Sequence, residues 1–219
     1  MEPNYDKAAI AAINLLIENN ITSTPISPLP ILKSMDGVIV MSFTEMSDFI
    51  GIERQQLISV FGLPNQDAVT TVRIKDSKIN YIVAYNQKLP MFMVQRALAR
   101  ELGHIVLGHD GSRPEEVRNA EAICFANHLL CPRPLIKTIQ DSGLPFTVEL
   151  LGNMTGCYEH CLNCMKNTPG TNVPAELNRK VKEQFKEYAE NFIRFQLVLS
   201  SDDTSRFCIF GSYMDNYRE

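Results

Sequence analysis

The sequence predicts an α+β protein that is mainly helical and contains a small antiparallel sheet. Two β-rich runs, Ala68–Lys75 and Lys78–Tyr85, flank Asp76-Ser77, a spacing that predicts a hairpin. With 219 residues, the chain is long enough to bury one sizeable core, or one core with a small satellite. Apolar residues recur at helical spacing in four longer segments: 5–19, 93–107, 115–130 and 176–199.

Shorter elements are expected between the first helix and the hairpin. The Pro-rich run Thr24–Pro30 is incompatible with a regular helix or a central strand, so we expect a connector there. Val38–Phe43 reads as a strand. Thr44–Phe61 is expected to form one or two short helices that stop at Gly62-Leu63-Pro64.

The second half of the chain is predicted to be helical. Cys131-Pro132 closes the helix Glu115–Leu130, and short helical segments follow at 135–142, 147–151 and 156–166. The long helix Glu176–Leu199 carries an apolar stripe that we expect to pack mostly within the molecule. Its members are Leu177, Val181, Phe185, Tyr188, Phe192 and Phe195.

Composition and charge exclude several classes of protein. The chain has 45% hydrophobic residues, 21% charged residues and a net charge of −4, which gives no electrostatic reason to expect direct nucleic-acid binding. The start of the chain lacks a basic segment, and the apolar run Ala8–Ile17 is too short to span a bilayer. We therefore expect a cytoplasmic protein without a membrane partner, whose six cysteines are reduced thiols.

The segment from Met93 to His109 carries the strongest chemical pattern. Residues 100–104, Arg-Glu-Leu-Gly-His, match the zinc-protease pattern H-E-x-x-H except at the first position. In the intact pattern, two His side chains one turn apart bind Zn²⁺, and the Glu activates the metal-bound water. Arg100 cannot replace the first His, because a guanidinium stays protonated and has no lone pair.

The surrounding strings resemble those of the ImmA/IrrE metallo-endopeptidases, over about residues 35–165. They are Tyr85-Asn86, the approach Pro90–Gln95, the string Ala99–His109, and Ala-Glu-Ala-x-x-Phe-Ala-x-x-Leu-Leu-x-Pro ending at Pro132. The resemblance implies a zincin-like core with zinc ligands at the first motif position, His104 and Glu121, and with Glu101 as general base. It also implies three regions: 1–34, the N-terminal helix and connector; 35–167, the peptidase domain with a helical cap; and 168–219, the long helix and tail.

Arg100 leaves three outcomes open for the metal. In the first, which we favour, Arg100 pairs with Glu101 or Glu121 and the site does not bind metal. In the second, His109 replaces the missing ligand; on a continuous helix it would point about 140° away from His104, but Gly108 could end the helix and let it fold back. In the third, His104, Glu121 and waters bind zinc weakly.

Other residues are weaker candidates. Tyr85, Asn86, Arg96 and His128 are expected as possible cleft-lining side chains, with His128 read as a rim or packing residue. The string Cys157-x-x-His-Cys-x-x-Cys164 resembles a zinc knuckle, but its spacing also forms one stripe of a buried helix, which we favour. Cys124 is expected in the core.

Two functions follow from this reading. In one, the chain is a zinc metallo-endopeptidase of the ImmA/IrrE type that cleaves a helix-turn-helix repressor of a mobile element or stress response. In the other, it is an inactive pseudo-peptidase that binds a peptide or protein partner without cutting it. Zn²⁺ is the expected cofactor only if the site is functional. The identity of Arg100 is the feature that distinguishes the two.

Overall fold

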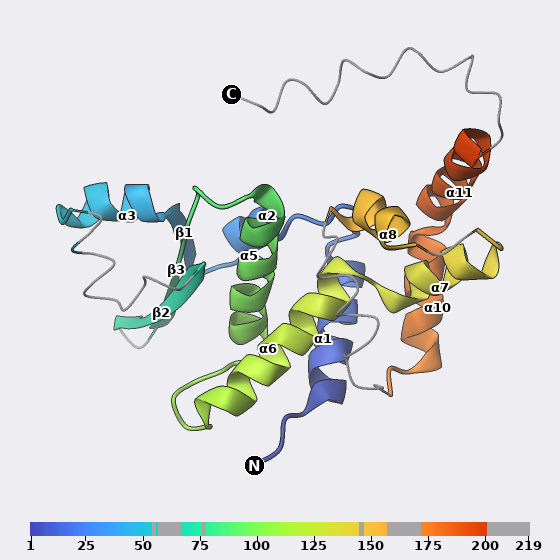
Figure 1. Ribbon diagram of the computed structural model, residues 1–219. Helices are drawn as coiled ribbons and strands as arrows, with labels where there is room; N and C mark the ends of the chain where they lie inside the picture. Colours follow the sequence, from blue (N-terminus) through green and yellow to red (C-terminus); the bar gives the residue numbers. More distant parts are fainter. Residues whose placement is uncertain (54–55, 57–66, 76–77, 145–146, 157–171, 201–219) are drawn as a thin grey trace.

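The computed structural model describes residues 1–53, 56, 67–75, 78–144, 147–156 and 172–200 (Figure 1). In this part of the chain the fold is mixed α+β and mainly helical, as the sequence predicts. Its helices are α1 (Tyr5–Glu18), α2 (Pro28–Ser34), α3 (Phe43–Ile50), α5 (Met91–Val106), α6 (Glu115–Leu130), α7 (Arg133–Asp141), α8 (Val148–Thr155), α10 (Ala175–Gln184) and α11 (Lys186–Ser200).

One three-stranded sheet is formed by β1 (Val38–Ser42), β2 (Ala68–Lys75) and β3 (Lys78–Tyr85), in the order β1-β3-β2. The predicted hairpin is confirmed, because β2 and β3 are antiparallel. The expectation of an antiparallel sheet is wrong for β1, which runs parallel to β3. Hairpin signals are local, whereas the direction of β1 depends on the long connection through α3 that returns the chain to the sheet.

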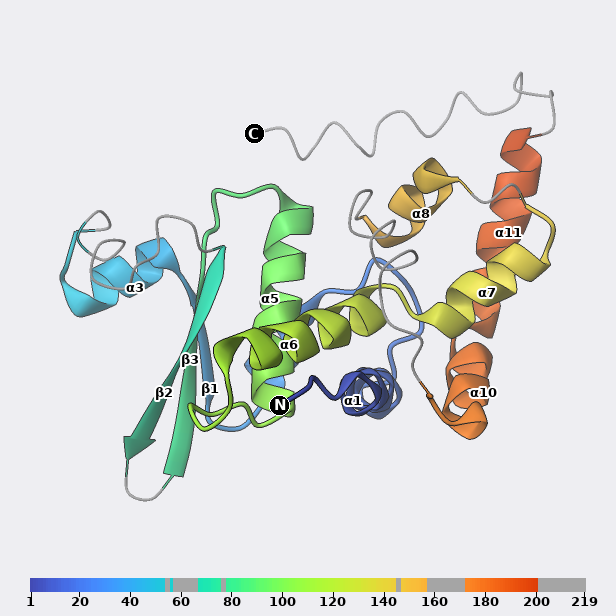
Figure 2. The same cartoon turned by 60° about the horizontal axis from the view of Figure 1, so that its bottom comes forward.

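Helix α5 lies between the sheet and α6, whereas α3 lies on the far side of the sheet from α5 (Figures 1 and 2). Helix α5 contacts β2 and β3 on one side and packs against α6 on the other. Gly103 makes this close packing possible, since a Cβ there would lie 3.0 Å from Phe125 Cδ1 and 3.2 Å from the Ala122 carbonyl oxygen. A larger residue at position 103 would therefore push α5 and α6 apart.

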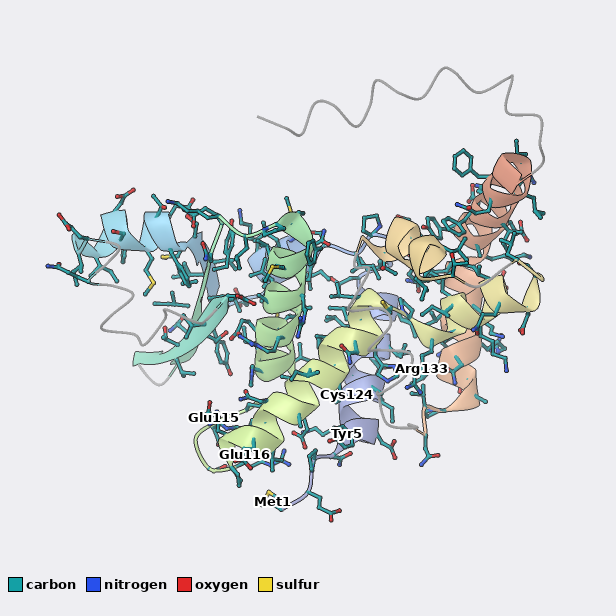
Figure 3. The ribbon with its side chains drawn as sticks, viewed as in Figure 1. Met1, Tyr5, Glu115, Glu116, Cys124 and Arg133 are labelled. Atoms are coloured by element: carbon teal, nitrogen blue, oxygen red, sulfur yellow. The ribbon has the colours of Figure 1, made fainter. Side chains whose placement is uncertain are left out.

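The N-terminal helix α1 packs against α6 and α10. Small and aliphatic side chains form its buried face, which belongs to the same core as α5, α6 and α7. Figure 3 shows Tyr5 and Cys124 on these neighbouring helices, and the Cys124 thiol donates to the Tyr5 carbonyl oxygen at 3.6 Å. Burial raises the pKa of Cys124 to about 11, which agrees with the core position predicted for this thiol.

Two expectations about helix boundaries are wrong. The Pro-rich connector contains the start of α2, because Pro28 and Pro30 occupy the first turn, where backbone N–H groups have no helical partner. The long C-terminal helix is divided at Phe185 into α10 and α11. Gln184 donates to the carbonyls of Leu16 and Ile21 at 2.8 and 2.5 Å, a tertiary contact that helical periodicity does not encode.

The C-terminal helices pack on the body of the molecule as expected. Val181 and Phe185 are fully buried, and Tyr188 stacks on Phe192 and shares a hydrogen bond of 2.5 Å with Thr24. Phe195 departs from the expectation, because 49% of it is exposed. The Cys157–Cys164 string, Cys208 and the tail from 201 lie outside the described residues. No helix in the described ranges is long and apolar enough to cross a membrane.

Candidate functional site

Arg100 and Glu101 of α5 form an ion pair. The Arg100 guanidinium donates to Glu101 Oε1 from Nη2 at 2.9 Å and from Nε at 3.1 Å. Nη2 also donates to the Ala68 carbonyl oxygen at 3.2 Å. Arg100, at the first ligand position, therefore binds the carboxylate of Glu101, to which the family resemblance assigns the role of general base.

The second oxygen of Glu101 is also occupied. Its Oε2 accepts a hydrogen bond of 2.7 Å from the hydroxyl of Thr70 on β2, and the side chain is only 6% exposed. Both oxygens of Glu101 are thus held by the protein, one by a cation and one by a neutral donor. The carboxylate is therefore engaged on both sides by groups of the protein itself.

Glu121 on α6 is buried and carries more hydrogen bonds than Glu101. Arg113 donates to both of its oxygens in a bidentate pair, Nη1 to Oε2 at 2.7 Å and Nη2 to Oε1 at 2.8 Å. The backbone N–H of Asn4 donates to Oε1 at 2.6 Å, and His109 Nε2 lies 2.9 Å from Oε2. Burial raises the pKa of Glu121, but these donors outweigh it and the pKa is lowered overall.

The N-terminal segment covers Glu121. In addition to the Asn4 contact, Met1 accepts a hydrogen bond at its sulfur from Arg113 Nε at 3.2 Å. Figure 3 shows Met1 near the start of α6, where Glu115 and Glu116 are labelled. The first residues of the chain therefore hold both members of the Arg113–Glu121 pair.

His109 folds back onto α5. Helix α5 ends at Val106, and Gly108 adopts a left-handed φ of +65°, which costs glycine little. The N–H of His109 bonds to the His104 carbonyl at 3.0 Å, and that of Gly108 bonds to the Ile105 carbonyl at 3.1 Å. This pattern is a Schellman motif, and it turns the His109 side chain toward His104. Of the two orientations considered for His109, the structure has the one in which Gly108 ends the helix.

The two imidazoles are in direct contact. His104 Nδ1 lies 2.9 Å from His109 Nδ1, and the rings meet edge to face with centroids 5.0 Å apart. Neutral rings satisfy both His109 contacts if His104 Nδ1–H donates to His109 Nδ1 and His109 Nε2–H donates to Glu121. Burial, with a smaller effect of His109, lowers the pKa of His104 to about 4, and burial also lowers the pKa of His109. Both rings are therefore neutral at pH 7.

His104 and His109 border a cleft of about 320 Å³ between β2, α5 and the loop before α6. We call it the α5 cleft; its lining includes Ala68, Thr70, Arg100, Glu101, His104 and His109. The strand β2 is an edge of the sheet and forms one wall. The α5 cleft thus joins an exposed strand edge to the polar residues of the motif.

In this structure the residues at the predicted ligand positions are engaged by other protein groups. Arg100 offers no lone pair, both oxygens of Glu121 accept from Arg113, and His104 contacts His109 through Nδ1. Zinc sites in enzymes need three protein ligands with free lone pairs. Among the residues that the structure describes, no three His, Cys, Asp or Glu side chains are placed to hold a metal.

The remaining predicted residues lie away from the α5 cleft. His128 is 2% exposed and borders a different cavity, which agrees with a packing role. Arg96 lies with Arg100 at a small cavity of about 60 Å³. Tyr85 ends β3, and burial, then the charge of Glu45, raises its pKa. Asn86 follows it, and its side chain accepts from the N–H of Lys88 at 3.2 Å.

The sequence analysis missed Arg113, Thr70 and Asn4. Arg113 stands directly before Pro114 and the start of α6, so its position eight residues, or about two helical turns, before Glu121 was a usable signal. Thr70 and Asn4 are far from their partners in sequence, 31 residues from Glu101 and 117 from Glu121. Only the tertiary fold brings them to the site.

No protein-family model, curated protein or solved structure matches this chain. The likeness to the ImmA/IrrE peptidases therefore rests on the strings around residues 85–132 and stays a prediction.

Proposed function

We propose that this protein is a pseudo-peptidase: a chain with a zincin-like core that binds an extended segment of a protein partner in the α5 cleft and does not hydrolyse it. The observation that carries the proposal is the ion pair of Arg100 with Glu101, with contacts of 2.9 and 3.1 Å. This pair places a fixed positive charge at the first ligand position and occupies the carboxylate that would activate water.

The second ion pair supports the same conclusion. Glu121 would be the ligand supplied by the second helix, but Arg113 binds it through two hydrogen bonds and the N-terminal backbone through a third. Freeing Glu121 for a metal would leave the partly buried Arg113 guanidinium without its carboxylate. Breaking a buried pair in this way is strongly unfavourable.

The α5 cleft suits an extended peptide. Among the described strands its wall β2 pairs only with β3, so its other edge can accept main-chain hydrogen bonds from an added strand. Val72, which is 53% exposed, lines the cleft on this strand. The family resemblance suggests the partner, a helix-turn-helix repressor of a mobile element or stress response.

One observation favours a second candidate, a metallo-endopeptidase that uses His104, His109 and Glu121. The Gly108 turn brings His109 within 2.9 Å of both other side chains. This ligand set would require His109 to release Glu121 and Arg113 to move away. The two candidates make opposite predictions about cleavage.

A binding and cleavage experiment tests the proposal. A helix-turn-helix repressor of a mobile element is titrated into the full chain by calorimetry, and the mixture is then incubated with zinc and analysed by mass spectrometry. The expected result is binding without cleavage. Val72→Asp should weaken binding at least about tenfold, since it puts a charge on the cleft wall. Ile39→Asp, at the opposite edge strand β1 and 52% exposed, is the matched control and should bind normally.

Two results would overturn the proposal. Cleavage of the repressor that a chelator abolishes would establish the peptidase. Absence of binding, or equal loss in the two variants, would remove the α5 cleft as the binding surface.

A further inference from the structure

A second cavity, of about 510 Å³, lies on the other side of α6 from the α5 cleft, where α1, α7 and α10 meet. Four cations line it: Arg133 and Lys137 of α7, and Arg179 and Lys182 of α10. We call it the cationic pocket. Figure 3 shows Arg133 at the start of α7, facing the region of α1 and α10.

Helical spacing places these cations on the facing surfaces of their helices. Arg133 and Lys137 are four residues apart, and Arg179 and Lys182 are three apart, so each pair shares one side of its helix. Ala175 and Asn178 of α10 extend the same surface to i, i+3, i+4 and i+7. The two pairs therefore meet across the pocket.

The carboxylates on the neighbouring elements do not neutralise the pocket. Among the described residues, none that lines it is an Asp or a Glu. Glu176 pairs with Lys180 at 3.0 Å, and Asp6 accepts from the backbone of Asn172 at 2.8 Å. Within the described ranges, Lys137, Arg179 and Lys182 make no ion pair with a carboxylate.

The pocket also has an apolar lining. Ile13, Pro134 and the ring of His128 are buried, Val173 is half-buried and Ala175 is exposed. Burial, then the charge of Arg133, lowers the pKa of His128 to about 4, so the ring is neutral at pH 7. The pocket combines a positively charged rim with an apolar interior.

Two helices begin at this pocket. Arg133 and Pro134 open α7, and Ala175 opens α10, whose N-cap Pro174 provides no side-chain hydrogen bond to the first N–H groups. The positive ends of both helix dipoles add to the potential of the four cations. Every charge in the pocket thus favours an anion.

We propose that the cationic pocket binds a small phosphorylated ligand of about mononucleotide size, with its phosphate at the rim and its apolar part against Ile13 and Pro134. The volume of about 510 Å³ lies in the range of small-molecule sites. A concave site between helix ends suits a compact ligand better than a nucleic-acid strand, which would need a continuous charged groove. The proposal does not depend on the function of the α5 cleft, because the two sites share no residue.

Calorimetric titration of the full chain with AMP at low salt tests this proposal. AMP is the probe because it joins one phosphate to a flat ring system. We expect AMP to bind, and adenosine, which has the ring without the charge, to bind at least about tenfold more weakly. The double variant Lys137→Gln, Lys182→Gln should lose at least about tenfold in AMP affinity. Lys180→Gln, on the same helix but outside the pocket, is the matched control and should stay within about twofold.

Amide NMR shifts of the unmodified protein give a second measurement that needs no variant. AMP should shift signals of α7 and the start of α10 and leave those of β2 unchanged. The proposal is overturned if AMP does not bind at about 10 mM, if adenosine binds as tightly as AMP, or if Lys180→Gln weakens AMP as much as the pocket variant. Binding of an oligonucleotide without binding of AMP would also overturn it and indicate a nucleic-acid surface.

Discussion

The α5 cleft and the cationic pocket differ in how their charged side chains are paired within the protein. In the α5 cleft, Arg100 is paired with Glu101, and beside the cleft, in contact with His109, Glu121 is paired with Arg113. In the cationic pocket, Lys137, Arg179 and Lys182 have no carboxylate within ion-pair distance among the described residues. Charges paired inside the protein contribute to stability, whereas unpaired charges around a cavity are available to a ligand. The difference agrees with the two proposals above, in which the α5 cleft binds a partner segment without metal chemistry and the cationic pocket binds an anion.

The largest loss of stability is expected from Glu121→Ala, because Glu121 is the most buried member of the two ion pairs. Arg113 and His109 would lose their acceptor, and removing one member of a buried pair costs about 3–5 kcal/mol of unfolding free energy. Urea unfolding at pH 7 measures the loss. Glu176→Gln, in the exposed pair with Lys180, is the control and should leave the unfolding midpoint unchanged. Equal effects in the two variants would show that Glu121 is not a structural anchor.

A smaller loss of stability is expected from a substitution between α5 and α6, the helices that carry Glu101 and Glu121. Gly103→Ala adds a methyl group 3.0 Å from Phe125 Cδ1, and overpacking of this kind costs about 1–3 kcal/mol. Gly111→Ala is the control, because nothing lies within 4 Å of its added Cβ. Thermal unfolding followed by circular dichroism compares them. A stabilised Gly103→Ala protein would contradict the close approach of the two helices.

The two regions should respond alike to acid, because each contains at least one imidazole whose pKa is lowered by burial. The folded-state pKa values of His104 and His128 are about 4, below the ordinary value of 6.5. As pH falls from 6.5 toward 4, the unfolded chain binds protons that the folded protein does not, so stability decreases over this window. Urea unfolding at pH 7 and pH 5 should show the decrease, and His128→Gln should make it smaller. An unchanged pH dependence in that variant would contradict the buried neutral ring.

The smallest effect is expected at Lys182 of the cationic pocket. Without an anion, Lys182→Gln should raise stability by about 0.2–0.5 kcal/mol at low salt, since it removes repulsion from Arg179 on the same helix face. Lys180→Gln removes an attractive contact with Glu176 and should give no gain. Melting temperatures at low and high salt distinguish the two, because salt should abolish the gain. A loss of stability in Lys182→Gln would show that its charge is compensated.

Local patterns were enough to predict most elements of the fold. The alternating strands β2 and β3, and helix α6, have the bounds that the sequence indicates, because their periodicity is strong and their ends carry turn residues. The parallel direction of β1 and the break at Phe185 were not predictable, since both depend on contacts between distant segments. Sequence periodicity carries no information about such contacts.

The site was predictable in part. The motif predicted that Arg100 would fill the place of the missing ligand, and its partner is one of the two carboxylates considered, Glu101. The pairing of Glu121 with Arg113 and with the backbone of Asn4 was not predicted, because the sequence does not reveal that the N-terminus crosses the start of α6. The cationic pocket was missed for a similar reason: the sequence does not reveal that the basic residues of α10 lie opposite those of α7.

The zinc content of the tag-free protein is the most direct test of the central claim, that internal ion pairs keep metal out of the α5 cleft. Wild type, Arg100→His, and the double variant Arg100→His, Arg113→Gln are dialysed against zinc and measured by elemental analysis. We expect wild type to hold almost none, Arg100→His a fraction, and the double variant about one zinc per chain, because only the last restores a ligand and frees Glu121. One zinc per wild-type chain, lost in His104→Ala, would contradict the claim and favour the peptidase.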